Sequence, residues 1–339
     1  MINKLRIAVL MGGRSSEHAI SVASARSVVG GLDPEHYEVR SIEISQDGRW
    51  RLPQARREEL GPEDAPLPVP VKGAIEPFRE VDVVFPVLHG PFGEDGTVQG
   101  LLELAGVAYV GSGVTASALC MDKDLFKSVM RDKGVPVTRS VTVRPWSRNG
   151  VESPFGFPVV VKPARLGSSV GISIARSPEE LEPAVALAFE HDEKVLLEEY
   201  VRGVEVECSV LGNEQPIASI PGEIVPLKAD WYDFASKYDE DGMELVIPPR
   251  IPEAAIARVQ EVSVAAFLAS DCEGMARVDC FFREDGEVLV NEVNTIPGFT
   301  ATSVYSKLFE ASGISYSELL DRLVELALER QTRRASLKY

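Results

Sequence analysis

The stretch MARVDCFFREDGEVLVNEVN, residues 275–294, decides how the C-terminal part of the chain folds. An Asp-Gly pair between two apolar-rich runs is a strong hairpin signal, so we expect Asp285 and Gly286 to form a two-residue turn between antiparallel strands. Alternate side chains along a strand share one face of the sheet. One face of this hairpin is therefore apolar and packs in a core, and it carries Val278, Cys280, Phe282, Leu289 and Val293.

The other face of the hairpin carries a polar cluster. A two-residue turn places Asp279 opposite Glu292 and Arg277 opposite Asn294. Directly opposed carboxylates have Cβ atoms about 5 Å apart, which is destabilising unless a proton or a cation lies between them. Two carboxylates and a carboxamide without His or Cys predict a Mg²⁺ site that takes further oxygens from substrate phosphates. In the alternative interpretation the face is exposed, and Arg277 simply pairs with Asp279 or Glu292.

A second stretch, VVVKPARLGSSVG at residues 159–171, runs from an apolar strand into a lysine and a loop of small residues. The Lys162 ammonium is costly to bury there unless an anion meets it. The loop of Gly167, Ser168 and Ser169 provides backbone N–H groups that can close over the same anion. Alone, the fragment favours a lysine that reaches solvent before a flexible loop. Together with the acidic hairpin face it predicts a clamp for a nucleoside triphosphate. No GxxxxGK[ST] motif occurs, and GxGxxG is absent from the first strand–helix turn, so another ATP fold is required.

Bulk properties narrow the class of protein. The chain has 339 residues, which suggests two or three domains. Its 35 Lys and Arg residues against 52 Asp and Glu residues give a formal net charge of −17, a surface that repels nucleic acid and anionic lipid. The four cysteines form no CxxC pair and fit a reduced cytosol. No apolar stretch is long enough to span a membrane.

Strand and helix signals divide the chain into three parts. We expect an N-terminal α/β domain with a parallel sheet at 1–115, a central α+β unit at 116–213 that includes a strand at 205–211, and a C-terminal unit at 214–339. The polar, aromatic segment 227–244 suits a mobile lid over a site. Within the first domain, apolar runs predict strands at 5–11, 37–44, 81–88 and 107–110 and helices at 16–29 and 97–105.

Along almost its whole length, the chain resembles the D-alanine–D-alanine ligases of the ATP-grasp superfamily. Seven motifs carry the resemblance in the family's order: HGPFGEDG, MDKDLFK, VKPARLGSSVG, LLEEYVRGVEVE, DFASKY, ARVDCF and NEVNTIPGFTATS. Any one of them alone is weak evidence, whereas seven in sequence are specific. The resemblance implies an ATP-grasp fold, of mixed α/β and α+β class, that follows the N-terminal parallel-sheet domain.

The resemblance also implies residues for the nucleotide and the metal. ATP is the co-substrate, and two Mg²⁺ ions, replaceable by Mn²⁺, accompany it. The metal ligands correspond to Asp279, Glu292 and Asn294, in agreement with the hairpin argument. The ATP contacts correspond to Lys123, Lys162, Gly167, Ser168, Ser169, Glu198, Glu199, Val201, Glu205 and Lys237.

Further positions correspond to the family's amino-acid contacts. Glu17 matches the carboxylate that meets the ammonium of the first D-alanine, and His89 matches a second contact of that substrate. Arg277 and the N–H of Gly298 match the pair that stabilises an oxyanion. The carboxylate pocket of the second substrate corresponds to Ser303 and Val304. Tyr238 is expected to hydrogen-bond through Ser168 towards Glu17.

The activity implied is ATP-dependent joining of two D-alanines through a D-alanyl phosphate, in peptidoglycan synthesis by a cytoplasmic homodimer. A rival is a D-alanine–D-lactate ligase, and Tyr238 argues against it because the ester-forming ligases lack that phenol. Another ATP-grasp ligase that joins a carboxylate to an amine is disfavoured by the joint presence of Glu17, Ser168 and Tyr238. A nucleotide-binding regulatory protein without turnover would be expected to lack a metal ligand or a phosphate lysine.

Overall fold

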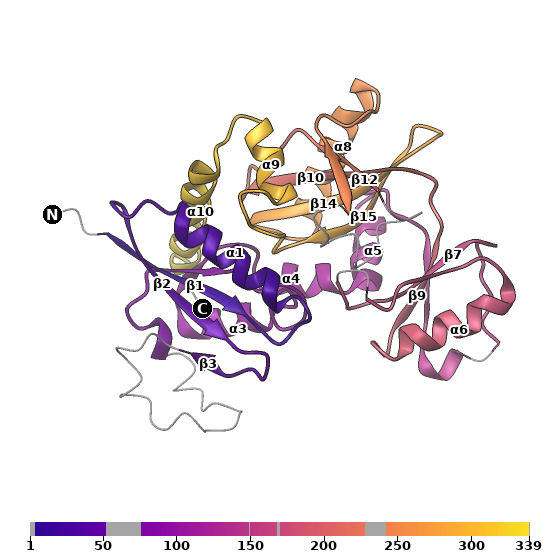
Figure 1. Cartoon of the computed structure of the whole chain (residues 1–339), viewed down its shortest axis with the longest axis horizontal. Coiled ribbons are helices and arrows are strands. Elements are labelled where there is room, and N and C mark those ends of the chain that lie inside the picture. Colours follow the sequence, from indigo (N-terminus) through magenta and orange to yellow (C-terminus); the bar gives the residue numbers. More distant parts are fainter. Residues whose placement is uncertain (1–3, 52–75, 149, 168–169, 228–241, 339) are drawn as a thin grey trace.

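The computed structural model describes residues 4–51, 76–148, 150–167, 170–227 and 242–338. Figure 1 shows an N-terminal sheet and a central sheet at opposite ends of the molecule, with a C-terminal sheet between them. Within the described ranges, no helix is both long and apolar enough to cross a membrane.

The N-terminal sheet has five strands in the order β3-β2-β1-β4-β5. Its four main strands are parallel, as predicted, and a short edge strand is antiparallel. Helices cover both faces through apolar side chains. The elements are β1 (Leu5–Gly12), α1 (His18–Gly31), β2 (Tyr37–Ile44), β3 (Trp50–Arg51), β4 (Val83–Pro86), α3 (Thr97–Ala105) and β5 (Ala108–Tyr109).

The central sheet has four antiparallel strands in the order β6-β9-β7-β8. Helix α6 (Pro178–Phe189) packs on it around Leu181, Val185 and Ala188. The strands are β6 (Ser140–Val143), β7 (Val159–Pro163), β8 (Ser173–Ala175) and β9 (Val195–Glu199). Lys162 lies on β7 and Glu198 on β9, near the ends of the two middle strands of this sheet.

The C-terminal sheet has six strands, and β10 (Gly203–Gly212) lies in its middle between β12 and β14. The strand predicted at 205–211 was assigned to the central unit, so the expected boundary at 213 is wrong for this strand. It pairs with β14 over its whole length because both strands alternate apolar residues against the same core. The other strands are β11 (Ile217–Ala218), β12 (Gly222–Pro226), β13 (Met243–Val246), β14 (Gly274–Arg283) and β15 (Val288–Asn294).

Helices cover both faces of the C-terminal sheet. On one face, α8 (Glu253–Ala269) packs together with α4 (Val114–Met121) and α5 (Lys123–Asp132). On the other face lie α9 (Val304–Ala311) and α10 (Tyr316–Ala335). The helix that begins at Lys123 therefore brings this lysine to the sheet that carries the acidic hairpin.

The hairpin of β14 and β15 has a three-residue loop, so the predicted two-residue turn is wrong. The main-chain hydrogen bond that closes the loop joins Arg283 N–H to the carbonyl oxygen of Glu287 at 2.9 Å. The longer loop shifts the neighbouring part of β15 by one residue, which exchanges its two faces. Val288 and Val290 consequently pack in the core in place of the predicted Leu289.

A bulge farther along β15 restores the predicted register at the polar face. Asn291 is inserted where the pairing between the strands shifts by one residue. Beyond this point Asp279 pairs with Glu292 and Arg277 pairs with Asn294, which confirms the predicted pairs. The longer loop shifts the register by one residue, and the bulge shifts it back. The cluster therefore contains the predicted residues, although neither the longer loop nor the bulge was predicted.

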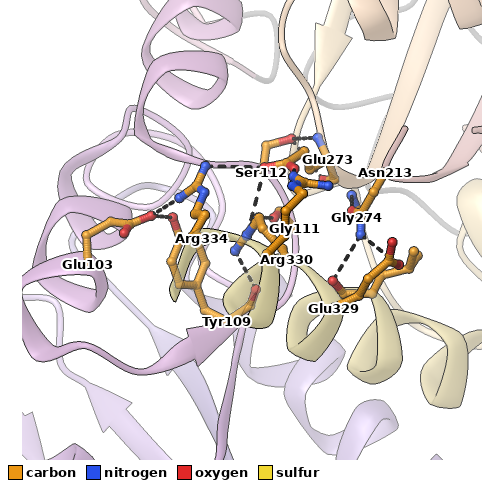
Figure 2. A network of polar contacts seen from close by, with 12 residues as sticks. Glu103, Tyr109, Gly111, Ser112, Asn213, Glu273, Gly274, Glu329, Arg330 and Arg334 are labelled. Carbon is orange, nitrogen blue, oxygen red and sulfur yellow. Dashed lines mark hydrogen bonds and ion pairs between the residues drawn. The ribbon is translucent and has the colours of Figure 1, made fainter. Parts of the chain in front are cut away.

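Helix α10 joins the C-terminal sheet to the N-terminal sheet. Its apolar face packs in the core that also contains β1, β4 and α1. Figure 2 shows the polar part of this junction. Arg330 is buried; its guanidinium donates to the carbonyl oxygens of Gly111 and, at 2.6 Å, of Tyr109. Arg334 lies 3.3 Å from the Glu273 carboxylate, just before β14.

Candidate active site

Two adjoining cavities lie along the C-terminal sheet. The first, of 510 Å³, opens between the central sheet and β10, β12, β14 and β15. The second, also of 510 Å³, opens between the N-terminal domain and the end of β15 with the loop that follows it. Gly167, Glu207 and Glu292 line both cavities, so the two meet at these residues.

The structure brings together every predicted site residue that it describes. Ser168, Ser169, Lys237 and Tyr238 lie outside the described residues, as does most of the predicted lid. The first cavity is lined by Lys123, Lys162, Gly167, Glu198, Glu199, Val201, Glu205, Asp279 and Glu292. The second cavity is lined by Glu17, His89, Arg277, Gly298, Ser303, Val304, Glu292 and Asn294.

A closed ring of polar contacts forms the inner wall of the first cavity. The Glu198 carboxylate lies 2.8 Å from Lys127 Nζ and 2.8 Å from Lys162 Nζ. The bulge residue Asn291 completes the ring, because its carbonyl oxygen accepts from Lys127 at 3.1 Å and its side-chain oxygen accepts from Lys162 at 3.2 Å. Burial alone would raise the pKa of Glu198, but Lys127 and Lys162 lower it to about 2. Glu198 is therefore ionised at neutral pH, and the ring carries a net positive charge.

Lys123 extends this basic wall towards the acidic hairpin. Its ammonium donates to the carbonyl oxygen of Leu166 at 2.8 Å and lies 3.1 Å from Glu292 Oε2. Asp122 caps the helix that begins at Lys123, and both its oxygens accept from Lys194 Nζ, at 2.8 and 2.7 Å. A buried ion pair thus fixes the start of α5 against the central sheet, which positions Lys123 between the loop at 166–167 and the hairpin.

The acidic face of the hairpin is charge-compensated within the chain. Arg277 donates to both oxygens of Asp279, at 2.7 and 2.8 Å, and Asn294 Nδ2 donates to Asp279 Oδ2 at 3.0 Å. Glu292 has Lys123 as its cation. Of the alternative expectation, the pairing of Arg277 with Asp279 is thus confirmed, but the exposed face is wrong, because these side chains are only 18% and 15% exposed. This pairing does not exclude a metal site, since Asp279 and Glu292 are opposed across the strands as that site requires.

The donor set of this face fits Mg²⁺. Two carboxylates and an amide oxygen are hard ligands, and Mg²⁺ is commonly held by one or two carboxylates together with waters and substrate phosphates. Both cavities reach Glu292, so phosphate oxygens in the first cavity can approach the same face. Among the described residues, no group of three or more His, Cys, Asp or Glu side chains forms an all-protein metal cage.

The second cavity is lined by two carboxyl groups from the N-terminal domain, the buried Glu17 and the partly buried Glu94. A Cβ on Gly90 would lie 2.8 Å from Glu17 Oε2, so only glycine, at φ +73°, leaves this oxygen its space. Gly167, from the loop after β7, also approaches Glu17, since a Cβ there would lie 3.7 Å from the same oxygen. Burial and the nearby Glu17 raise the pKa of Glu94 to about 8. Glu17 lines the second cavity, so an ammonium in that cavity can reach its side chain.

The N-terminal domain also holds the loop that follows β15. The N–H of Ile296 donates to Glu94 Oε1 at 3.2 Å, and its carbonyl oxygen lies 2.9 Å from His89 Nδ1. His89 Nε2 lies 3.3 Å from Ser24 Oγ, which accepts from the N–H of Phe299 at 3.2 Å. Burial lowers the pKa of His89, which favours the neutral ring in these two contacts. Gly298 therefore lies in a loop fixed on both sides.

Sequence reasoning missed Glu207, Asn291 and Glu94, which line the cavities, and the buried Lys127, which contacts Glu198 behind the first cavity. Asn291 and Glu292 are adjacent polar residues in an otherwise apolar strand, and this break in the alternation was a detectable sign of a bulge. Glu207 shares a strand face with Glu205, two residues earlier, which period-two alternation also shows. Lys127 had no such signal, since its partners come from distant segments.

Known proteins resemble this chain over its full length. Two family models match it, one described as D-ala D-ala ligase N-terminus at residues 6–112 and one as D-ala D-ala ligase C-terminus at residues 129–325. A D-alanine–D-alanine ligase of Caldicellulosiruptor bescii is 43% identical and covers 100% of this chain and 99% of its own.

Solved structures agree with these matches. The D-alanine–D-alanine ligase of Coxiella burnetii has a TM-score of 0.84 and 38% identity, over 98% of this chain and 96% of its own. The Bacillus anthracis D-alanine–D-alanine ligase complexed with ATP has a TM-score of 0.78 and 30% identity, over 97% of this chain and 99% of its own. The expected fold class is thus confirmed.

Proposed function

The chain belongs to the D-alanine–D-alanine ligase family, and from this premise we propose that it uses ATP to join two D-alanines into a dipeptide. The observation that carries the proposal is the junction of the two cavities. One cavity is lined by the residues that correspond to the ATP contacts, and the other by those that correspond to the amino-acid contacts. A phosphate at the end of one cavity is therefore adjacent to a carboxylate in the other.

We assign the nucleotide to the first cavity. Lys162 and Lys123 face the phosphates, while Glu198, Glu199, Val201 and Glu205 line the part that receives adenine and ribose. Asp279, Glu292 and Asn294 hold Mg²⁺, which when bound neutralises phosphate charge that develops during transfer. The basic ring around Glu198 adds a fixed positive wall without requiring a mobile counterion.

The first D-alanine occupies the second cavity with its ammonium at Glu17. Its carboxylate then points towards the shared wall, where it attacks the γ-phosphate of ATP and gives D-alanyl phosphate and ADP. Glu17 orients the substrate through charge, and Glu94 behind it stays largely protonated at neutral pH, so the pair carries about one negative charge. The implied contact of His89 with this substrate stays a prediction, because both its ring nitrogens are engaged within the protein.

The amine of the second D-alanine attacks the activated carbonyl, and phosphate leaves. Arg277 and the N–H of Gly298 stabilise the oxyanion that forms, because both border the cavity in which the carbonyl lies. Ser303, which accepts from the N–H of Thr300 at 3.0 Å, and Val304 receive the second carboxylate at the start of α9. A helix N-terminus favours an anion at that position.

The experiment that tests this proposal measures ADP release and identifies products by mass. With Mg²⁺ and ATP, D-alanine alone should give equal amounts of ADP and dipeptide, whereas L-alanine should give neither. Adding D-lactate or D-serine tests the choice of acceptor. If ester dominates near neutral pH, the chain is a D-alanine–D-lactate ligase. If ATP binds without turnover, the assignment as a ligase is wrong.

Tyr238 provides a second test of the acceptor. The resemblance implies that this phenol hydrogen-bonds through Ser168 towards Glu17, so we expect Tyr238→Phe to move product formation towards hydroxy-acid acceptors. We expect the ratio of ester to dipeptide at pH 7 to rise in the variant, measured with equal D-alanine and D-lactate. An unchanged ratio would remove the argument against the ester-forming rival.

We further propose that the protein supplies dipeptide for peptidoglycan in the cytoplasm, as a homodimer. Family membership supports the pathway and the compartment, and the four free, buried cysteines fit a reducing environment. The dimer is an expectation from the resemblance, and its direct test is the molar mass in solution at micromolar concentration.

A further inference from the structure

Glu207 occupies the wall shared by the two cavities, yet the proposed mechanism does not use it. It is buried on β10, with 6% of its surface exposed, and its pairing partner on β14 is Asp279. The pairing of β10 with β14 is continuous over ten residues, so the relation between these two carboxylates is fixed by the sheet. The same strand face carries Glu205 towards the first cavity.

Glu207 and Asp279 compete for the same arginine nitrogen. Arg277 Nε lies 2.7 Å from Asp279 Oδ1, to which it donates, and 2.9 Å from Glu207 Oε2. This nitrogen carries a single hydrogen, which points at one carboxylate at a time. Arg277 is thus bound to Asp279 through two parallel hydrogen bonds, with Glu207 at ion-pair distance on the other side.

Arg277 and a divalent cation need the same oxygens of Asp279. Arg277 bonds to both of them, and Asn294 bonds to one. If Asp279 serves as a metal ligand, at least one of these bonds must be given up. Without a second carboxylate, the guanidinium would then lose its anchor at the moment when it is needed to face the reacting carbonyl.

We infer that Glu207 is a positioning residue that takes over Arg277 when Asp279 turns to the metal. The inference rests on the proposed function, since it needs a cation at Asp279. A small rotation about the guanidinium directs the Nε hydrogen from Asp279 to Glu207, over a distance already short enough for a charge-assisted bond. The two remaining guanidinium nitrogens can then turn towards the second cavity, which Arg277 lines. Filling of the nucleotide site thereby completes the amino-acid site.

The effect of metal distinguishes this role of Glu207 from a purely structural one. If Glu207 only balanced charge, its loss would loosen Arg277 equally with and without metal. If Glu207 receives Arg277 from Asp279, its loss has little effect without metal, because Asp279 holds the guanidinium, and a large effect with metal.

The test observes the Arg277 Nε–H directly by ¹⁵N-arginine NMR, with the resonance assigned from Arg277→Lys. Exchange of this hydrogen with water is measured without metal and with Mg²⁺ plus the non-hydrolysable analogue AMP-PCP. In the unmodified protein exchange should stay slow in both states. In Glu207→Met it should stay slow without metal and accelerate about tenfold or more with Mg²⁺ and analogue, which is the loss expected for one hydrogen bond to a charged group.

Two further variants control the experiment. Glu207→Gln keeps the shape and one acceptor, so it should show an intermediate acceleration and guards against loss of folding in the Met variant. Glu273→Gln removes a carboxylate held among arginines in the junction of Figure 2, away from both cavities, and should leave the exchange unchanged in both states. In steady-state kinetics, Glu207→Gln should raise the KM for D-alanine by more than the KM for ATP.

Three outcomes decide the question. Faster exchange of the Arg277 Nε–H in Glu207→Met only in the presence of metal supports the inference. Equal acceleration in both states, or none in either, overturns it. Replacing Mg²⁺ by Mn²⁺ shows whether a negative result concerns only Glu207 or also the proposed metal site. Mn²⁺ is paramagnetic, so Mn²⁺ bound at Asp279 must broaden the Arg277 resonance of the unmodified protein. If the resonance stays sharp, the metal site itself is wrong and the inference fails with it.

Discussion

Replacing Lys127 by methionine should destabilise the protein strongly, although Lys127 lines neither cavity. The side chain is fully buried and lies 2.8 Å from Glu198. Its ammonium also donates to Thr138 Oγ1 and to the carbonyl oxygen of Asn291. Methionine has similar length but neither charge nor donors, so the variant removes one partner of a buried ion pair and leaves the other in place.

The expected loss of stability depends on which partner Glu198 keeps in the variant. Removing one partner of a buried ion pair costs about 3–5 kcal/mol, because the other charge stays buried without full compensation. Here Lys162 still contacts Glu198 at 2.8 Å, which places the cost at the lower end. We therefore expect Lys127→Met to lower the free energy of unfolding by about 3 kcal/mol. The KM for ATP should rise as well. Lys162 is then the one lysine that compensates the charge of Glu198, so less of its own charge is available to the phosphates.

The assay is urea unfolding followed by tryptophan fluorescence at pH 7.5, with two comparison variants. The double variant Lys127→Met/Glu198→Gln also removes the negative charge of Glu198, so it should recover about 2 kcal/mol of the lost unfolding free energy. Lys133→Met removes an exposed lysine from the end of the same helix, where its pair with Asp132 spans 3.7 Å. That change should stay within about 0.5 kcal/mol.

Two results would refute the reasoning. A cost below about 1 kcal/mol for Lys127→Met would show that the buried ammonium is not required to compensate Glu198. A double variant no more stable than the single one would show that the cost comes from lost packing or lost hydrogen bonds, because removal of the charge at Glu198 would then bring no relief.

Three other perturbations test separate features. Glu292→Gln should lower ADP formation by more than about 100-fold through loss of a metal ligand, and full activity would contradict the metal assignment. Glu94→Gln tests a pH effect. The folded-state pKa of Glu94 is raised to about 8 from an ordinary value of 4.5, so its contribution to stability is complete below pH 4.5 and is lost as the pH rises through 8. The unmodified protein should therefore lose up to about 4 kcal/mol relative to Glu94→Gln between pH 5 and 8, measured by urea unfolding at each pH; a constant difference between the two proteins would disprove the raised pKa. Arg330→Met should cost about 3 kcal/mol, because it leaves two buried carbonyl oxygens without their donor, whereas Arg322→Met, which removes an exposed pair with Glu318, should cost under about 0.5 kcal/mol in the same thermal unfolding experiment.

Local patterns predicted the N-terminal sheet well, because its strands are continuous apolar runs and its helices have clear ends. The bounds of the helix at 97–105 and of the strand at 37–44 agree with the structure. The assignment of β10 failed for a different reason. A strand pattern indicates which face is apolar, but it does not show which sheet the strand joins, and β10 joins a partner about 70 residues away in the chain.

In the candidate site, too, local contacts could be predicted from the sequence and contacts between distant segments could not. Asp279 and Glu292 could be paired from the sequence because a single hairpin links them, and the error in the loop was offset by the bulge at Asn291. The contacts of Lys127 could not be predicted because they depend on how α5 packs against two sheets, and those of Glu207 because they depend on the pairing of two strands distant in the chain. Motifs therefore identified the residues in the site, whereas the charge compensation among them required the structure.

The position of α10 has a consequence for synthesis of the chain. The side chains of Leu319, Leu323 and Ala327 complete a core against β1 and β4 that also contains α1, so the first sheet to leave the ribosome lacks part of its cover until α10 is made. At about 5–20 residues per second, the segment between β5 and α10 takes roughly 10–40 s to translate. During that interval the uncovered part of this apolar face is a target for chaperones. A message truncated before residue 316 therefore yields a product with part of this face exposed, even though every described strand of that sheet has been made.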